Sequence, residues 1–243
     1  MKKLIFLDCE TTGLEEEDRL IQLAYKVDDI VVDKLFKPSK RISIGAMAVH
    51  HITEEMVKDC EVFDGSETKA ALSNLLEQSF TLIAHNASFD IKMLEREGMG
   101  VENFICTFKI AKFLDKDEKI ESYSLQYLRY LLELDKEIDT DITAHDALGD
   151  ILVLEKLFER LFTKMSETME VSNEEVVLEE MIRISSEPAL IRSFKFGKHK
   201  GRKLEEVVQE DRGYLEWLYG QKTNESEPDE DWIYTLKYYL KLP

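Results

Sequence analysis

The chain has 243 residues, 44% of them hydrophobic, which is enough for one large domain or for one domain with a small addition. Its formal net charge of −18 excludes a general polyanion binder, so any nucleic-acid contact must come from local basic patches or bound metal. Three widely spaced cysteines fit neither a disulfide framework nor a zinc cluster. With no signal peptide and no apolar run of membrane-spanning length, they predict a cytoplasmic protein with reduced thiols.

The first predicted element is a buried strand over residues 3–7, which leads directly into Asp8 and Glu10. Side chains alternate across a strand, so these two acids emerge on one face and Cys9 on the other. Adjacent acids at the end of a buried strand are costly unless a cation lies between them, and hard divalent cations prefer carboxylate oxygens. The small side chains of Thr11-Thr12-Gly13 then turn the chain and expose backbone N–H groups that suit a phosphate. Taken alone, an Asp-x-Glu pattern more often marks an acidic strand end that faces solvent.

Two further strands are predicted over residues 19–27 and 30–36, on either side of the turn signal Asp28-Asp29. Together with the first strand they form an antiparallel meander. A basic loop follows at residues 37–41, and Thr53 is the expected N-cap of a short helix.

Strands and helices alternate in the next part of the chain. Helices are predicted over residues 67–78, 89–97, 124–134 and 144–162, and short strands over residues 80–84 and 104–107, the second of which feeds a helix ending near residue 112. This order predicts an α/β layered domain that covers residues 1–163.

The charge of the chain changes twice after this domain. Residues 164–191 are rich in glutamate but keep an apolar face at helical spacing, which predicts an acidic helical linker exposed to solvent. Residues 192–203 are basic, and Gly197 and Gly201 predict a tight hairpin-like turn there. With three short helices after it, this turn predicts a small second module over residues 192–243.

The basic turn has two interpretations. Its lysines are either a solvated face that balances the acidic segment before it, or a contact surface for a DNA duplex or strand. We prefer the second interpretation, because this is the densest positive patch on an anionic chain. The residues expected to contact DNA are Lys195, Lys198, Lys200, Arg202 and Lys203.

Two further acidic sites follow the pair at residues 8 and 10. Asp90 comes just after a predicted strand, preceded by His85 and Asn86, and Asp150 follows His145 at the start of a predicted helix. Each site has an ordinary explanation when it is taken alone, either as turn chemistry or as a surface acid on an amphipathic helix.

In this order, Asp-x-Glu, Asn-x-x-x-Asp and His-x-x-x-x-Asp resemble the three motifs of the DnaQ-like 3′→5′ exonucleases, in their His-containing DEDD subgroup. The segments 46–53, 105–107, 194–198 and 213–215 are similar to the exodeoxyribonuclease X group of this family. The resemblance therefore covers nearly the whole chain. It implies a ribonuclease H-like mixed sheet flanked by helices, in the α/β class, with a small C-terminal α+β module.

The resemblance also implies a metal mechanism. Four carboxylates around one point cannot all stay ionised without counter-charge, and two Mg²⁺ or Mn²⁺ ions about 3.5–4 Å apart would supply it. Asp8 would bridge both ions, and Glu10, Asp90 and Asp150 would complete their ligand shells. His145 would act as general base on water, since its ordinary pKa of about 6.5 lies near working pH. Residues five apart in a regular helix diverge by roughly 140°, so His145 could share the site with Asp150 only from the frayed start of that helix.

Substrate contacts are expected by the same resemblance. Thr11, Thr12 and Gly13 would receive the terminal nucleotide on backbone N–H groups, and Leu14 would wedge against its base. A histidine at position 50 is expected to have a satisfied structural role. The remaining expected contacts are His85, Asn86 and Phe89, although core packing is an equal alternative for Phe89.

We therefore expect a metal-dependent 3′→5′ exodeoxyribonuclease that releases 5′-mononucleotides, in DNA repair or end trimming. Its partner would be DNA with a 3′ end, single-stranded or duplex. One alternative is a 3′→5′ exoribonuclease of the RNase T or oligoribonuclease type, because the sequence does not reveal the contacts to a 2′-OH. Another is a non-catalytic nucleic-acid or polymerase-associated scaffold, which the complete set of acids and His145 argues against.

Overall fold

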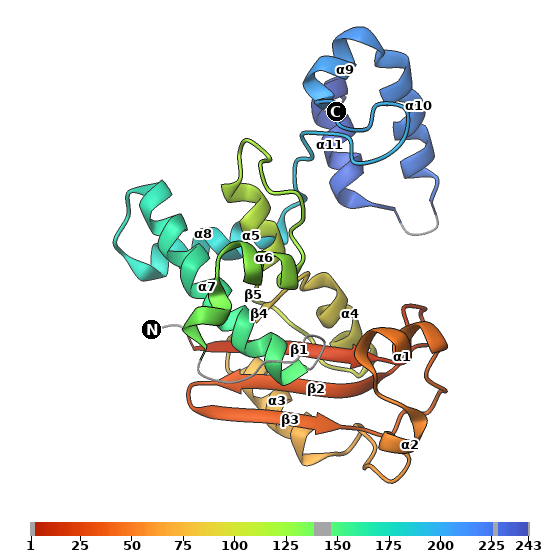
Figure 1. Cartoon of the computed structure of the whole chain (residues 1–243), viewed down its shortest axis with the longest axis vertical. Helices are drawn as coiled ribbons and strands as arrows, with labels where there is room; N and C mark the ends of the chain where they lie inside the picture. Colours follow the sequence, from red (N-terminus) through yellow and green to blue (C-terminus); the bar gives the residue numbers. More distant parts are fainter. Residues whose placement is uncertain (1–2, 139–146, 226–227, 243) are drawn as a thin grey trace. The chain divides into compact units, whose positions relative to one another are not determined.

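The computed structural model describes residues 3–138, 147–225 and 228–242. The chain divides into two compact units (Figure 1). The first consists of Met1–Leu114 and Ser122–Ser185, and the second of Asp115–Glu121 and Ser186–Pro243. Within the described residues, no helix is long and apolar enough to cross a membrane.

A mixed sheet of five strands forms the centre of the first unit, in the order β3-β2-β1-β4-β5 (Figure 1). Its strands are β1 (Leu4–Thr11), β2 (Leu20–Val27), β3 (Ile30–Leu35), β4 (Thr81–Ala84) and β5 (Phe104–Cys106). The first three strands are antiparallel, whereas β4 pairs parallel with both β1 and β5. The expected antiparallel meander and the expected mixed sheet are confirmed.

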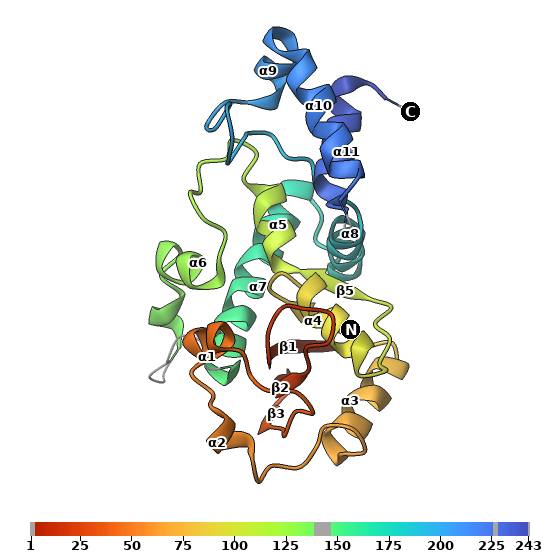
Figure 2. The same cartoon turned by 90° about the vertical axis from the view of Figure 1, so that its right-hand side faces the viewer.

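Helices flank this sheet, as Figure 2 shows in a view turned by 90° from that of Figure 1. They are α1 (Ile44–His50), α2 (Glu54–Val57), α3 (Glu67–Glu77), α4 (Ser88–Arg96), α5 (Thr107–Leu114), α6 (Leu125–Leu131), the 3₁₀ helix η1 (Leu134–Glu137), α7 (Ala147–Met169) and α8 (Glu174–Ser186).

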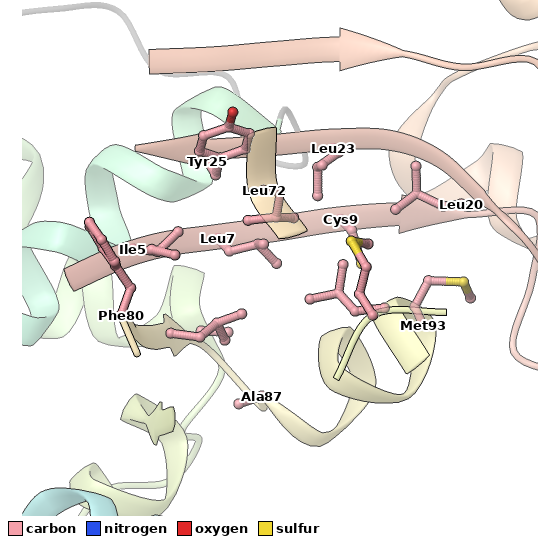
Figure 3. Close-up of a cluster of buried hydrophobic side chains, with 14 of the residues drawn as sticks. Ile5, Leu7, Cys9, Leu20, Leu23, Tyr25, Leu72, Phe80, Ala87 and Met93 are labelled. Atoms are coloured by element: carbon pink, nitrogen blue, oxygen red, sulfur yellow. The ribbon is translucent and has the colours of Figure 1, made fainter. Parts of the chain in front are cut away.

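One face of β1 is apolar along its whole length. Ile5, Leu7 and Cys9 point to this face and pack with Leu72 of α3 and Met93 of α4 (Figure 3). All of these side chains are nearly or fully excluded from solvent. Their burial anchors β1 at the middle of the sheet.

The other face of β1 changes from apolar to acidic. Phe6 packs edge-to-face on Phe158 of α7, with ring centroids 5.6 Å apart, and by alternation Asp8 and Glu10 follow on the same face. From Phe6 to Glu10 the strand advances about 13 Å, and from Phe158 back to Asp150 the helix spans about 12 Å. Packing of the two phenylalanines therefore sets Asp150 beside the acids of β1.

Helix α8 belongs to the first unit, which corrects the expected linker over residues 164–191. Residues up to Met169 continue α7, and Val177, Leu178 and Met181 of α8 are buried. The Ser185 hydroxyl accepts a 2.8 Å hydrogen bond from the backbone N–H of Cys106, at the end of β5. The glutamates within α8 are not among its buried residues.

Three helices surround the apolar core of the second unit: α9 (Leu204–Glu210), α10 (Arg212–Thr223) and α11 (Glu230–Leu240). In this core Phe194 stacks on Trp232, with ring centroids 5.6 Å apart and an interplanar angle of 29°. The other tryptophan, Trp217, is 56% exposed on α10. The basic segment is a turn closed by an isolated bridge between Ser193 and Lys203, with no regular strand on either side.

Candidate active site

A cavity of about 610 Å³ in the first unit brings the predicted acids together. Asp8 and Glu10 come from β1, Asp90 from the first turn of α4, and Asp150 from the first turn of α7. They converge because β4 leads into α4 beside β1, and because α7 packs on the acidic face of β1.

The two acids of β1 have raised pKa values. The pKa of Asp8 is raised well above its usual value, first by burial and then by the charges of Asp90, Asp150 and Glu10. The pKa of Glu10 is raised to about 8 by burial, and then by the carboxylates of Asp150 and Asp90. The charge contributions to these shifts arise because the four side chains line one cavity.

Asp90 is hydrogen-bonded to Cys9 of β1. Only 2% of this residue is exposed, and its Oδ1 accepts hydrogen bonds from both the backbone N–H and the thiol of Cys9, each at 3.2 Å. Burial raises the pKa of Asp90 to about 7, although the hydrogen bonds from Cys9 oppose this rise. Cys9 thus orients an acid that the pattern of the sequence did not connect to it.

Asp150 is oriented by a residue that the sequence did not single out. Gln126 of α6 donates from Nε2 to Oδ1 of Asp150 at 2.5 Å, and Arg129 donates from Nη1 to Oε1 of Gln126 at 3.3 Å. No local pattern signals this contact, because Gln126 and Asp150 are 24 positions apart.

The turn after β1 forms one wall of the cavity. Thr11, Gly13 and Leu14 line it, and Leu14 is 81% exposed. Thr12 differs from the expectation, because its backbone N–H donates to the carbonyl oxygen of Arg19 at 2.9 Å and its side chain is fully buried. In the described chain the N–H groups of Gly13 and Leu14 have no such acceptor. They are the groups of this turn that remain available to a ligand.

His85, Asn86 and Phe89 also line the cavity. Both ring nitrogens of His85 are engaged, Nδ1 with the Thr107 hydroxyl at 2.9 Å and Nε2 with the Tyr123 carbonyl at 2.8 Å. Burial lowers the pKa of His85 to about 4. This histidine is therefore held neutral and has no free nitrogen for proton transfer.

His50 departs from its expected satisfied role. It lines the cavity, is 5% exposed and accepts a 3.0 Å hydrogen bond at Nδ1 from the backbone N–H of Ile52. Its Nε2 must then carry the hydrogen of the neutral ring. The ring interacts with the backbone of Thr11, but this buried atom has no hydrogen bond of good geometry in the described structure. An unsatisfied buried donor in a cavity wall is a candidate contact for a ligand.

The donor set of the cavity suits a hard divalent cation, because its four carboxylates offer oxygen ligands. Burial and neighbouring carboxylates raise the pKa values of Asp8 and Glu10, so a positive charge between the acids would be favourable. Among the described residues, no three His, Cys, Asp or Glu side chains are close enough to hold an ion as they stand. The predicted general base His145 lies outside the described residues.

The basic turn of the second unit is partly neutralised. Lys198 pairs with Asp211 at 2.7 Å, and Arg202 pairs with Glu210 at 2.8 Å. Lys195 and Lys200 are exposed and form no ion pair with any described residue. These two lysines are the better candidates for an external partner.

Comparisons with protein families match both parts of the chain. Residues 5–158 match the exonuclease family, and residues 194–222 match the exodeoxyribonuclease X-like C-terminal family. Exodeoxyribonuclease 10 of Escherichia coli K12 is 30% identical over 245 aligned positions, which cover 98% of this chain and 99% of that protein. A PolC-type DNA polymerase III of Thermotoga petrophila is 32% identical over 67% of this chain and 13% of its own length.

Solved structures of two nucleases have a fold similar to that of this chain. Exonuclease X, in a complex with 5′ overhanging duplex DNA, matches with a TM-score of 0.55 and 26% identity, over 75% of this chain and 99% of that one. The nuclease domain of 3′hExo, a DEDDh family member bound to rAMP, matches with a TM-score of 0.53 and 13% identity, over 67% of this chain and 92% of that one. The predicted ribonuclease H-like arrangement of sheet and helices is thereby confirmed.

Proposed function

The chain belongs to the exonuclease family, and from this premise we propose that it is a 3′→5′ exodeoxyribonuclease that releases 5′-mononucleotides in DNA repair or end trimming. The observation that carries the proposal is the convergence of Asp8, Glu10, Asp90 and Asp150 on one cavity. Similarity to exodeoxyribonuclease 10 along 98% of the chain, including the C-terminal unit, favours DNA over RNA as substrate.

Exonucleases of this family use divalent metal ions. We propose two, Mg²⁺ or Mn²⁺, which Asp8, Glu10, Asp90 and Asp150 would hold. When bound, such ions clamp the attacking and leaving oxygens of an in-line displacement. The hydrogen bonds from Cys9 to Asp90 and from Gln126 to Asp150 would hold two of these carboxylates in place before the ions arrive.

His145 is the proposed general base. It lies outside the described residues, two positions before Ala147 at the described start of α7. His85 is not a rival, because both of its nitrogens are occupied. A His145→Ala protein should bind metal and DNA normally but turn over about 10²–10⁴ times more slowly, as single-turnover kinetics would reveal. Unimpaired turnover would remove His145 from the mechanism.

The turn after β1 is the proposed seat of the 3′-terminal nucleotide. The free N–H groups of Gly13 and Leu14 would donate to it, and the exposed side chain of Leu14 would wedge against its base. His50 would add a further hydrogen-bond donor from Nε2. The other proposed contacts in the cavity are Thr11, His85, Asn86 and Phe89. Thr12 is not among them, because its polar groups are all occupied within the turn. The proposed DNA contacts outside it are Lys195, Lys198, Lys200, Arg202 and Lys203.

One assay tests the activity. DNA and RNA oligomers of the same sequence, labelled at the 5′ end, are incubated with Mg²⁺, Mn²⁺ or EDTA, and released mononucleotides are identified by chromatography. We expect stepwise shortening of DNA that requires metal and is lost in Asp8→Ala, while Asp64→Ala, which changes an exposed acid outside the cavity, stays active. Shortening of RNA alone would favour the exoribonuclease alternative, and cleavage that survives EDTA or Asp8→Ala would overturn the metal mechanism.

Metal binding has its own readout. Because a ligand that binds only the folded state stabilises it, Mn²⁺ at about a hundred times its Kd should add about 2.7 kcal/mol to the free energy of unfolding of the wild type. This gain should be much smaller in Asp8→Ala and unchanged in Asp64→Ala, as thermal unfolding would measure. An equal gain in Asp8→Ala would place the ions elsewhere.

A further inference from the structure

Asp18 stands apart from the other acids of its loop. Glu15, Glu16 and Glu17 are exposed, whereas Asp18 is only 3% exposed and lines the cavity of the active site. A buried carboxylate is costly unless its oxygens are satisfied. The hydrogen-bond partners of Asp18 therefore show which segments it connects.

Both oxygens of Asp18 are engaged by the turn that follows β1 and by the basic loop. Oδ1 accepts from the Thr12 hydroxyl at 2.6 Å and lies 3.0 Å from Nζ of Lys40. Oδ2 accepts from the backbone N–H of Glu15 at 2.7 Å. Burial alone would raise the pKa of Asp18, but the hydrogen bonds from Thr12, Lys40 and Glu15 outweigh it and leave this pKa lowered. The carboxylate thus stays charged at neutral pH.

The Thr12 side chain connects the Asp18 carboxylate to the backbone of the loop. Its hydroxyl oxygen also accepts a 3.0 Å hydrogen bond from the N–H of Arg19. Its carbonyl oxygen accepts from the N–H of Ser43 at 2.9 Å, just beyond the basic loop. Every polar group of Thr12 is therefore occupied, and the residue has one defined position.

Gly13 rests directly on the carboxylate. A Cβ atom at Gly13 would lie 2.5 Å from Oδ2 of Asp18, so only glycine permits this approach. The next N–H groups, those of Gly13 and Leu14, are the ones without an acceptor in the part of the chain that the structure describes. Asp18 therefore packs against the turn whose backbone N–H groups are available to a ligand in the cavity.

We propose that Asp18, together with Lys40, is a positioning residue that holds the turn of residues 12–14 in the geometry that receives the 3′-terminal nucleotide. This inference rests on the proposed function. Lys40 lines the same cavity and belongs to the basic loop. The Asp18–Lys40 pair, called the clamp below, therefore joins two segments that are separated in sequence. A preformed turn binds the end of the strand without a cost of ordering and keeps the scissile bond aligned with the acids.

The test compares two Asp–Lys pairs. Asp18→Asn puts an amide N–H₂ or a neutral oxygen opposite the N–H of Glu15, and Lys40→Met removes the cation. Asp64→Asn and Lys69→Met make the same changes in a 2.7 Å pair that lies outside the active-site cavity. Thr12→Val and Thr12→Ser separate loss of the hydroxyl from a change of shape.

Two readouts are measured on the full chain. Hydrogen exchange of the DNA-free protein follows the hydrogen-bonded amides of Thr12 and Arg19, which hold this turn, and steady-state kinetics follow DNA cleavage at 3′ ends. We expect Asp18→Asn to speed exchange of these amides about tenfold or more and to lower kcat/KM about 10- to 100-fold. Thr12→Val should act in the same direction and Thr12→Ser should restore both values, while the control pair changes neither.

Unchanged exchange and unchanged kcat/KM in a folded Asp18→Asn protein would overturn the proposal. If Asp18→Asn does not fold, Lys40→Met and Thr12→Val decide it by the same two readouts, since Lys40 is exposed. A wild type without activity on DNA would end the proposed function but not the clamp, because faster exchange in the variants would still support it. An active wild type with indifferent variants would end the clamp alone.

Discussion

Glycine 13 illustrates how a single residue depends on contacts across the active-site wall. Asp18 is fixed by hydrogen bonds from Thr12 and Glu15, so its carboxylate cannot swing away from an added methyl group. The position offers no other space, because the Cβ atom would meet this carboxylate at 2.5 Å. Glycine is needed at this position because of packing against Asp18.

We expect Gly13→Ala to lower the free energy of unfolding by about 1–3 kcal/mol, the usual cost of overpacking, and to reduce cleavage as well. Urea unfolding measures the first effect. Gly45→Ala is the control, because a Cβ atom there has Ser43 Oγ at 3.9 Å as its nearest neighbour. Equal stability of the two variants would mean that Asp18 moves freely.

Asp211 ties the basic turn to the start of α10. Hydrogen bonds from Lys198 and His199 lower its pKa to about 2. A carboxylate whose pKa is depressed in the folded state stabilises the fold above its unfolded pKa of about 3.9, and this contribution is lost as the pH falls through the folded value. Asp211→Asn should therefore be less stable than the wild type at pH 7, and the difference should shrink between about pH 4 and pH 2.

Denaturant midpoints followed by circular dichroism at several pH values would measure this trend. Glu205→Gln, which removes an exposed charge on α9, is the matched control. A difference that stays constant down to about pH 2 would show that Asp211 acts through shape rather than through its charge.

At the scale of helices and strands, buried contacts explain where the sequence succeeded and failed. Alternation along β1 and the apolar stripe of α7 predicted both elements, because burial leaves a periodic trace. Helix α7 nevertheless continues to Met169, since Met165 extends its buried stripe beyond residue 162. The glutamates of α8 are not among its buried residues, so they could not reveal that Met181 and Ser185 are buried in the first unit.

Ser185 makes this packing testable. Its hydroxyl accepts from the N–H of Cys106 at 2.8 Å and donates to the carbonyl of Met181 at 2.7 Å. We expect Ser185→Ala to cost about 1–3 kcal/mol of unfolding free energy, because it leaves a buried N–H unsatisfied at the end of β5. Thr163→Ala removes an exposed hydroxyl from α7 and should change stability by less than about 0.5 kcal/mol. A similar small change for Ser185→Ala would mean that water replaces the hydroxyl.

The acids of the candidate site show what the sequence contained. The order and spacing of Asp8, Glu10, Asp90 and Asp150 predicted that they meet, and they line one cavity. The partners Gln126 and Asp18 left no signal, because one polar residue in a helix or an acidic loop looks like any solvated side chain. Such contacts depend on which elements pack together, and that is decided by the apolar faces.

At the scale of the whole molecule, negative charge is unevenly distributed. The first unit carries 20 Lys and Arg against 35 Asp and Glu, whereas the second unit carries 12 against 15. The first unit therefore has a net charge of −15 and the second of −3. A polyanion approaching the protein meets less repulsion at the second unit, where Lys195 and Lys200 form no ion pair with a described residue.

We expect the double variant Lys195→Glu and Lys200→Glu to bind DNA more weakly. The slope of log affinity against log salt should fall by about one unit per lost phosphate contact. Binding to a catalytically inactive Asp8→Ala background, measured by fluorescence anisotropy of labelled DNA over a range of salt, avoids cleavage. The pair Lys237→Glu and Lys241→Glu makes the same charge change at the end of α11. If both pairs alter the slope equally, the basic turn is only a solvated face.

Both tryptophans of the chain lie in the second unit, one stacked in its core and one exposed on α10. The protein consequently carries an optical reporter for that unit alone. Its intrinsic tryptophan emission should follow the unfolding of the C-terminal helices without any contribution from the catalytic unit. Quenching upon addition of nucleic acid would involve Trp217 or Trp232, and a Trp217→Phe protein would tell which, with no label attached to protein or substrate.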